Sequence, residues 1–90
     1  MKKNHRQLER IVRGFSNHRR IQIVELLDRK PELSVLEISD HVRSGFRAVS
    51  EHLRRLTIAG LIVKRSEGRA VRHRLTDRGG RVLEFLRALD

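Results

Sequence analysis

The sequence predicts one mainly α-helical domain that carries a single β-hairpin, with its elements in the order α-α-α-α-β-β-α. Three observations lead to this prediction. Apolar residues recur at the spacing of an amphipathic helix through most of the chain. The spacing changes from about 3.6 to two over residues 61–65 and 70–75, as expected for two strands. The length of 90 residues allows a single domain spanning 1–90.

The first two predicted helices precede Pro31. Residues 4–13 form the first of them, and Gly14 is expected to end it. Its apolar stripe consists of Leu8, Ile11, Val12 and Phe15. Ser16 or Asn17 is expected to cap the second helix, whose apolar residues occupy more than one face and indicate burial. That helix should end just before Pro31, because the residue before a proline disfavours helical geometry.

A tight turn separates the third and fourth predicted helices. Ser34 and Glu37 have the spacing of a capping box, which predicts a short helix over Val35–Val42. Ser44 lies in the turn and is expected to cap a helix over Phe46–Ala59. The residues expected to be buried along this fourth helix are Phe46, Val49, Leu53 and Leu56. The residues expected to face outward are Arg47, Ala48, Ser50, Glu51, Arg54 and Arg55.

The hairpin and a last helix complete the chain. Residues 66–69 join the two predicted strands, and Gly68 is expected to supply the positive φ that a tight hairpin needs. Thr76 is expected to cap the last helix, over 77–89. Its apolar stripe consists of Val82, Phe85, Leu86 and Leu89.

The charge of the chain is strongly positive and unevenly distributed. The formal net charge is +10, from 21 Lys and Arg against 11 Asp and Glu. Residues 1–20 carry seven bases and one acid, and residues 43–74 carry nine bases and two acids. Residues 21–42 carry two bases and five acids. Such clustering favours a polyanion as the partner.

Several classes of protein do not fit the sequence. No apolar stretch reaches the ~20 residues that span a bilayer, and no apolar signal-peptide core follows the basic start, so no membrane partner is expected. The chain has no Cys, which agrees with a cytoplasmic, nucleoid-associated location. No nucleophile and base pair, carboxylate pair or phosphate loop indicates an enzyme or a cofactor.

The predicted elements form a known nucleic-acid-binding arrangement. A short capped helix, a tight turn and an outwardly basic helix make a helix-turn-helix, and a basic hairpin directly after it makes a wing. The second helix of such a pair fits the major groove of DNA. The residues expected to contact double-stranded DNA are Ser44, Arg47, Ala48, Ser50, Glu51, Arg54, Arg55, Lys64, Arg65 and Arg69.

Residues 17–76 resemble the winged helix of the ArsR-type transcriptional regulators. The matching stretches are Asn17–Leu27, Leu33–Ile38, Val49–Leu56 with Ala59–Ile62, and Glu67–Arg69 with Arg74–Thr76. The resemblance implies a winged helix-turn-helix fold and a homodimer that binds operator DNA. It also implies that the first and last helices, 4–13 and 77–89, form the dimer interface. The residues expected there are Leu8, Ile11, Val12, Phe15, Val82, Phe85, Leu86 and Leu89.

The sequence departs from the family pattern in three places. Arg43-Ser44-Gly45 replaces the usual Gly-Leu-Ser turn, and Phe46 is expected to supply the missing apolar contact. Glu51 stands where a polar or basic residue is common, so it either accepts from a cytosine amine or pairs with a nearby arginine. Residues 75–79 resemble the end of a MarR-type wing, which leaves the subfamily open.

Metal sensing, which the family invites, is not expected for this chain. The third helix has no Cys, and the five His, at positions 5, 18, 41, 52 and 73, form no i, i+4 pair. We therefore expect a sequence-specific DNA-binding regulator that acts as a homodimeric repressor without a metal or cofactor. The alternatives are an architectural DNA-binding protein without sequence preference and a winged helix whose basic face binds an acidic protein.

Overall fold

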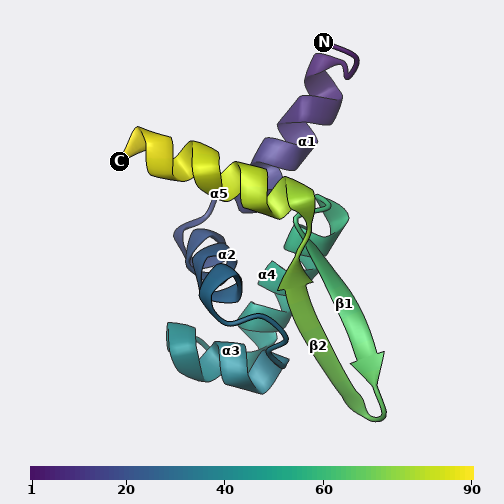
Figure 1. Cartoon of the computed structure of the whole chain (residues 1–90), viewed down its shortest axis with the longest axis vertical. Coiled ribbons are helices and arrows are strands. Elements are labelled where there is room, and N and C mark those ends of the chain that lie inside the picture. Colours follow the sequence, from purple (N-terminus) through teal and green to yellow (C-terminus); the bar gives the residue numbers. More distant parts are fainter.

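The computed structural model describes residues 1–90 and confirms the predicted fold class (Figure 1). Five helices surround a small core, and a two-stranded antiparallel hairpin projects from one side. The elements are α1 (His5–Phe15), α2 (His18–Arg29), α3 (Val35–Val42), α4 (Phe46–Ile58), β1 (Ile62–Glu67), β2 (Ala70–Leu75) and α5 (Asp77–Leu89). No helix is long and apolar enough to span a bilayer.

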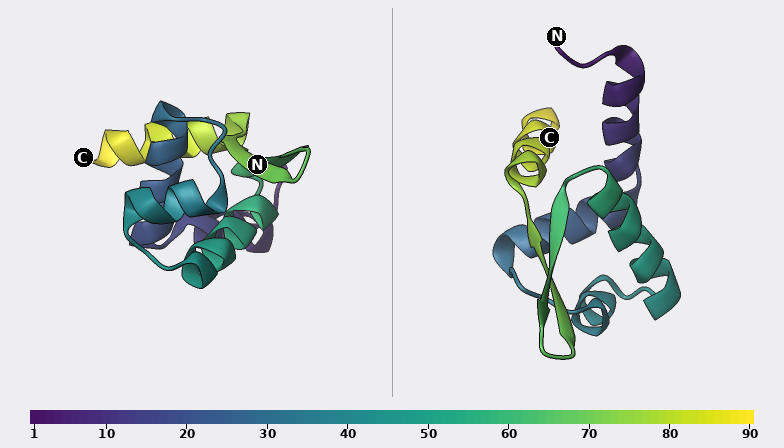
Figure 2. Two further views of the ribbon diagram at one scale, coloured as in Figure 1. Left: turned by 90° about the horizontal axis from the view of Figure 1, so that it is seen from below. Right: turned by 90° about the vertical axis from the view of Figure 1, so that its right-hand side faces the viewer.

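Helix α1 extends from the body as an arm and is longer than predicted (Figure 2). Asn4 and Gln7 form a capping box at its start, with backbone to side-chain distances of 2.8 and 2.9 Å. The prediction that Gly14 ends the helix is wrong. Gly14 lies inside α1, where a Cβ atom would collide with the Cβ of Ala59, the residue that follows α4. The glycine therefore permits a close approach of the two helices.

Helix α2 runs through the centre of the domain. Asn17, rather than Ser16, caps it, because its side-chain oxygen accepts from the backbone N–H groups of Arg19 and Arg20 at 2.9 and 3.2 Å. The helix ends at Arg29, just before Pro31, as predicted. The apolar core around it consists of Phe15, Ile23, Val24, Leu26, Leu27, Leu33, Ile38, Val42, Val49, Leu53, Leu56, Ala59, Leu61, Ile62 and Leu83.

The helix-turn-helix is present, with two corrections at the turn. The Ser34–Glu37 capping box is confirmed. The residue that caps α4 is Gly45 and not Ser44, and no side chain bonds to the helix start. The prediction that Phe46 is buried is wrong, because 56% of it is exposed. Buried residues of α3 already fill its contact with α4, so Phe46, the first residue of the helix, remains at the surface.

The wing is longer than predicted. Its strands continue to the pair Glu67↔Ala70, which leaves a two-residue loop with Gly68 at φ +60°. A positive φ at the first loop position is typical of the primed turns that close tight hairpins. Leu33, in the loop between α2 and α3, forms an isolated bridge with His73 of β2. The wing is therefore attached to the helix-turn-helix through this loop.

The junction between α4 and α5 is closely bonded. Thr76 caps α5, as predicted, because its Oγ1 accepts from the N–H of Gly79 at 3.1 Å. The same hydroxyl donates to the carbonyl of Gly60 at 2.6 Å. Arg78 donates to the carbonyl of Ala59 at 2.9 Å. The start of α5 is thus bonded to the two residues that follow α4.

Candidate nucleic-acid interface

The outward face of α4 is open to solvent. Arg47, Ala48, Glu51, Arg54 and Arg55 are exposed there, and Ser50 is half-buried. The opposite face is anchored in the core by Val49, Leu53 and Leu56. Because the buried residues fix the rotation of the helix, the polar face has a defined orientation. The first turn of α4 and the tip of the wing both lie at the end of the molecule opposite the N-terminus (Figure 2).

Glu51 organises the arginines of α4. Its carboxylate accepts from Arg54 at 2.7 and 3.1 Å and from Arg55 at 3.1 Å. The hydrogen bond from Arg54 is the largest of the effects that lower the pKa of Glu51 to about 2, so the residue is ionised at neutral pH. Of the two roles expected for Glu51, the free chain shows pairing with an arginine. Arg47 is exposed and has no carboxylate partner.

A second basic layer lies behind α4. Arg20 of α2 and His52 of α4 each have one buried nitrogen, Nε and Nδ1, without a hydrogen-bond partner. Burial, followed by the nearby Arg55, lowers the pKa of Arg20. Burial and the charge of Arg20 lower the pKa of His52. The guanidinium of Arg20 places positive potential beneath the exposed face of the helix.

The basic residues of the wing fall into two groups. Lys64 and Arg69 are exposed and have no carboxylate partner. Arg65 is bound by two acids: its Nε and Nη2 lie 3.2 and 3.0 Å from a carboxylate oxygen of Glu32, and Nη2 lies 3.0 Å from Glu67. These hydrogen bonds, chiefly the one to Glu32, raise the pKa of Arg65.

Two residues relevant to this surface are absent from the DNA contacts predicted from the sequence. Arg43 lies exposed in the turn before α4, in a left-handed conformation with φ +53°. The sequence signal for it is its place at the start of the Arg43-Ser44-Gly45 turn between two helices. Glu32 contacts the wing, although the sequence showed only one acid within a generally acidic segment. Nothing in the local sequence indicates a contact with residues more than 30 positions away.

The apolar stripes expected at a dimer interface are mostly accessible. Val12, Phe85 and Leu89 are 51, 56 and 67% exposed, and the remaining stripe residues except Phe15 are half-buried. Phe15 is 8% exposed and belongs to the core of the chain itself, so it offers little surface to a second copy. A cleft of about 420 Å³ lies between α2 and α5, lined in part by Ile21, Leu86 and Leu89. No group of three or more His, Asp or Glu side chains is placed to hold a metal ion.

The geometry defines a class of protein. A helix-turn-helix with an exposed basic second helix, followed directly by a β-hairpin and a closing helix, is the winged helix-turn-helix. Residues 17–64 match the family described as bacterial regulatory protein, arsR family. The chain belongs to the ArsR family of bacterial regulatory proteins.

Relatives and solved structures agree with this assignment. The chain is 29% identical over 76 residues to a cadmium resistance transcriptional regulatory protein, a CadC homolog of Staphylococcus aureus. That match covers 84% of this chain but only 63% of the relative, so the chain spans less than two thirds of its length. The structure of HlyU from Vibrio cholerae superposes with a TM-score of 0.80 at 33% identity, covering 99% of this chain and 97% of HlyU.

A further structure supports the fold alone. A homodimeric winged helix-turn-helix DNA-binding domain of a possible ArsR-family regulator from Mycobacterium bovis has a TM-score of 0.83. Its sequence is 24% identical, and the match covers 98% of this chain and 87% of that domain.

Proposed function

We propose that this chain is a transcriptional regulator that binds double-stranded DNA with sequence specificity. The observation that carries the proposal is the position of two cationic elements. Arg47, on the open face of α4, and Lys64 and Arg69, on the wing, have no carboxylate partners. The helix start and the wing tip lie at the same end of the molecule (Figure 2). A duplex laid against this end meets both elements together.

In this proposal, one group of residues recognises bases and another binds phosphates. The first half of α4 enters the major groove, where Arg47, Ala48, Ser50 and Glu51 face base edges and carry sequence specificity. Phosphates are neutralised or bound by Ser44 and Arg43 at the turn and by Lys64 and Arg69 on the wing. Arg54 and Arg55 on α4 face the duplex with their charge shared with Glu51. Release of counterions from those phosphates supplies most of the affinity. The positive end of the α4 dipole adds to the attraction.

The proposed functional unit is a homodimer. The half-exposed stripes of α1 and α5 offer apolar surface that a two-fold partner would cover. The homodimeric state of the Mycobacterium bovis domain of the same fold supports this arrangement. Two copies of α4 related by a two-fold axis would face half-sites ~34–36 Å apart. We further propose repression, because a dimer on such a site denies those base pairs to other proteins.

Selection of bound duplexes from a random pool tests the proposal. We expect recovery of a two-fold symmetric sequence, bound ~10³-fold or more tightly than a scrambled duplex of equal length. Binding without a preferred sequence would instead identify an architectural protein. Absence of binding to any duplex at low salt would refute a role in DNA recognition altogether. Transcription in vitro from a promoter carrying the selected site then tests repression against activation.

A further inference from the structure

The wing concentrates like charges on one of its faces. Arg65, Arg72 and Arg74 alternate with residues of the other face, and the strand register places Arg65 directly opposite Arg72. Like charges directly opposite each other in a strand pair destabilise the pair. A two-stranded hairpin is itself marginally stable in water. Glu67 of the hairpin pairs with Arg65 on this face, but it leaves Arg72 and Arg74 without a partner inside the hairpin. Contacts from outside the hairpin are therefore needed to hold this face in place.

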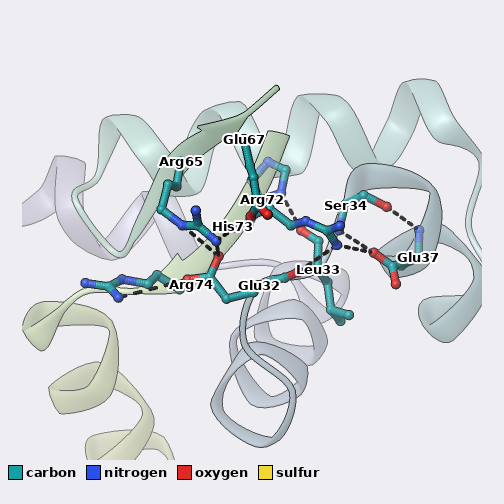
Figure 3. Close-up of polar contacts among 9 residues, drawn as sticks. All are labelled: Glu32, Leu33, Ser34, Glu37, Arg65, Glu67, Arg72, His73 and Arg74. Carbon is teal, nitrogen blue, oxygen red and sulfur yellow. Dashed lines mark hydrogen bonds and ion pairs between the residues drawn. The ribbon is translucent and has the colours of Figure 1, made fainter. Parts of the chain in front are cut away.

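Glu32 contacts the wing with every polar group it has (Figure 3). Its backbone N–H donates to the carbonyl of His73 at 2.8 Å. Its backbone carbonyl accepts from Arg72 at 3.2 Å. Its carboxylate accepts from Arg65 at 3.0 and 3.2 Å and lies 4.0 Å from Arg74. One residue between α2 and α3 thus bonds to both strands of the wing.

The backbone of Glu32 is held in an uncommon conformation. Its φ is +69°, in the left-handed region that residues other than glycine rarely adopt. Such a conformation persists only where the surroundings impose it, and it occurs preferentially at functional positions. Here the neighbouring contacts impose it, because Leu33 bridges His73 and Arg72 reaches Glu37 at 3.3 Å.

The same contacts determine how Arg65 can act. Three of the five N–H donors of its guanidinium are engaged by carboxylates, including the Nε and Nη2 edge that would grip a phosphate in a bidentate manner. Lys64 and Arg69, by contrast, have no carboxylate partner that would compete with a phosphate. On the wing, Arg65 is therefore held by carboxylates, whereas Lys64 and Arg69 are free to bind phosphate.

We propose that Glu32 and Arg65 are positioning residues that fix the wing against the helix-turn-helix, and that Lys64 and Arg69 make its phosphate contacts. The inference rests on the proposed DNA binding and assigns the roles within it. It reassigns Arg65, which the sequence placed among the DNA contacts. If Glu32 positions the wing, loss of its carboxylate weakens DNA binding, although the same change makes the protein more positive.

Salt dependence of binding separates the two roles. The slope of log Kobs against log [salt] becomes shallower by about 0.9 for each phosphate that the protein no longer neutralises. We expect Arg69→Gln to reduce the slope by about this amount per protomer. Arg65→Gln and Glu32→Gln should each weaken binding about three- to tenfold, as removal of one or two exposed ion pairs allows, at unchanged slope. Glu84→Gln is the matched control, since it makes the same charge change as Glu32→Gln at an exposed position of α5.

Two results would overturn the assignment. One is a reduced salt slope for Arg65→Gln equal to that of Arg69→Gln, which would make Arg65 a phosphate-binding residue. The other is tighter binding by Glu32→Gln than by the Glu84→Gln control, which would mean that Glu32 only offsets positive charge.

Hydrogen exchange of the free protein gives a readout that needs no DNA. The amide of Glu32 donates to His73, and the amide of His73 donates to Leu33 at 3.0 Å. Glu32→Gln and Arg65→Gln should both speed exchange at these two amides and leave α2 protected. Unchanged exchange in both variants would refute the positioning role. If the wild-type chain bound no duplex, the proposed function would be refuted. The hydrogen-exchange rates would still show whether Glu32 fixes the wing.

Discussion

His73 is the only polar side chain buried in the core, with 1% of it exposed. Its Nδ1 lies 2.8 Å from the carbonyl oxygen of Leu33. Because a carbonyl only accepts, Nδ1 carries the proton of a neutral imidazole. Burial lowers the pKa of His73, and the nearby charge of Lys64 lowers it further, against the opposing effect of the Leu33 hydrogen bond. A proton gained here would bring an uncompensated charge into the core.

This burial predicts a loss of stability in mild acid. The unfolded histidine takes up a proton near pH 6.5, above the pKa of the folded state, so the unfolded chain binds more protons as the pH falls below 6.5. The free energy of unfolding should then decrease by at most about 1.4 kcal/mol per pH unit for this group. His52, whose pKa is also lowered, acts in the same direction.

Urea unfolding at pH 5 to 8 measures the effect, with His73→Asn as the comparison. Asn keeps a donor close to the backbone but does not titrate, so its pH dependence should be shallower than that of the wild type. Carboxylates such as Glu51, with its lowered pKa, lose their contribution only below about pH 4.5 and lie outside this window. Parallel curves for the two proteins would show that His73 is not the source.

Glu51 restrains two arginines on α4 that would otherwise be free for phosphate. Replacing it with Gln removes the charge that holds Arg54 and Arg55, so both can turn to the backbone of the duplex. We expect Glu51→Gln to bind non-specific DNA more tightly, with a salt slope steeper by up to about 0.9 for each arginine released. Filter binding to a scrambled duplex at several salt concentrations measures this. A slope equal to that of the wild type would mean that both arginines already neutralise phosphates when Glu51 is present.

Helices α1 and α4 approach each other closely at Gly14. A Cβ at this position would collide with the Cβ of Ala59, so Gly14→Ala should destabilise the fold by about 1–3 kcal/mol, the usual cost of overpacking. Gly80→Ala is the matched control, because a Cβ there meets nothing within 4 Å. Removing a helical glycine at an open position should stabilise by about 0.4–1 kcal/mol. Thermal unfolding of both variants tests the contrast, which equal shifts in Tm would contradict.

The elements were predictable from local patterns. Apart from the cap of α4, which is Gly45 and not Ser44, the errors concern contacts between elements. The Ser34–Glu37 capping box, the cap at Thr76 and the glycine of the hairpin depend on neighbours within a few residues, and the sequence displays those neighbours directly. The role of Gly14 depends on Ala59, more than 40 positions away, and a glycine in a sequence indicates a break and a close approach equally well. Phe46 has the spacing of a buried residue, but burial needs a partner that the turn does not bring to it.

The two basic regions of the sequence, residues 1–20 and 43–74, separate only in part once the chain folds. Residues 1–13 lie on the N-terminal arm, which projects away from the wing tip (Figure 1). The basic residues of 43–74 lie on the turn, α4 and the wing. Net charge by segment therefore favoured a polyanion partner. It could not say that the arm projects away from the wing tip whereas Arg20, from the same basic region, lies behind α4. The candidate site was predictable on α4, whereas the pairing of Arg65 with Glu32 required the tertiary structure.

The exposed stripe of α5 predicts how the oligomer responds to a single change. Phe85 is 56% exposed in the isolated chain and is well placed for a partner to cover. Phe85→Asp should give a folded monomer, because a charged group buried in an apolar interface is strongly unfavourable. Light scattering measures the mass, and circular dichroism measures the fold. Glu84→Lys, at an exposed position on the face of α5 opposite the stripe, should leave the dimer intact. A dimer that survives Phe85→Asp would place the interface elsewhere.

The bonds at the junction of α4 and α5 have a mechanical consequence. The hydroxyl of Thr76 and the guanidinium of Arg78 tie the base of α5 to carbonyls at the end of α4, and a side chain at Gly79 would collide with the carbonyl of Leu61. Because these contacts hold the start of α5 against the residues that follow α4, we expect the two helices to move together. In the proposed dimer, a tilt of α5 would therefore change the separation of the two α4 helices, and with it their match to successive turns of the major groove.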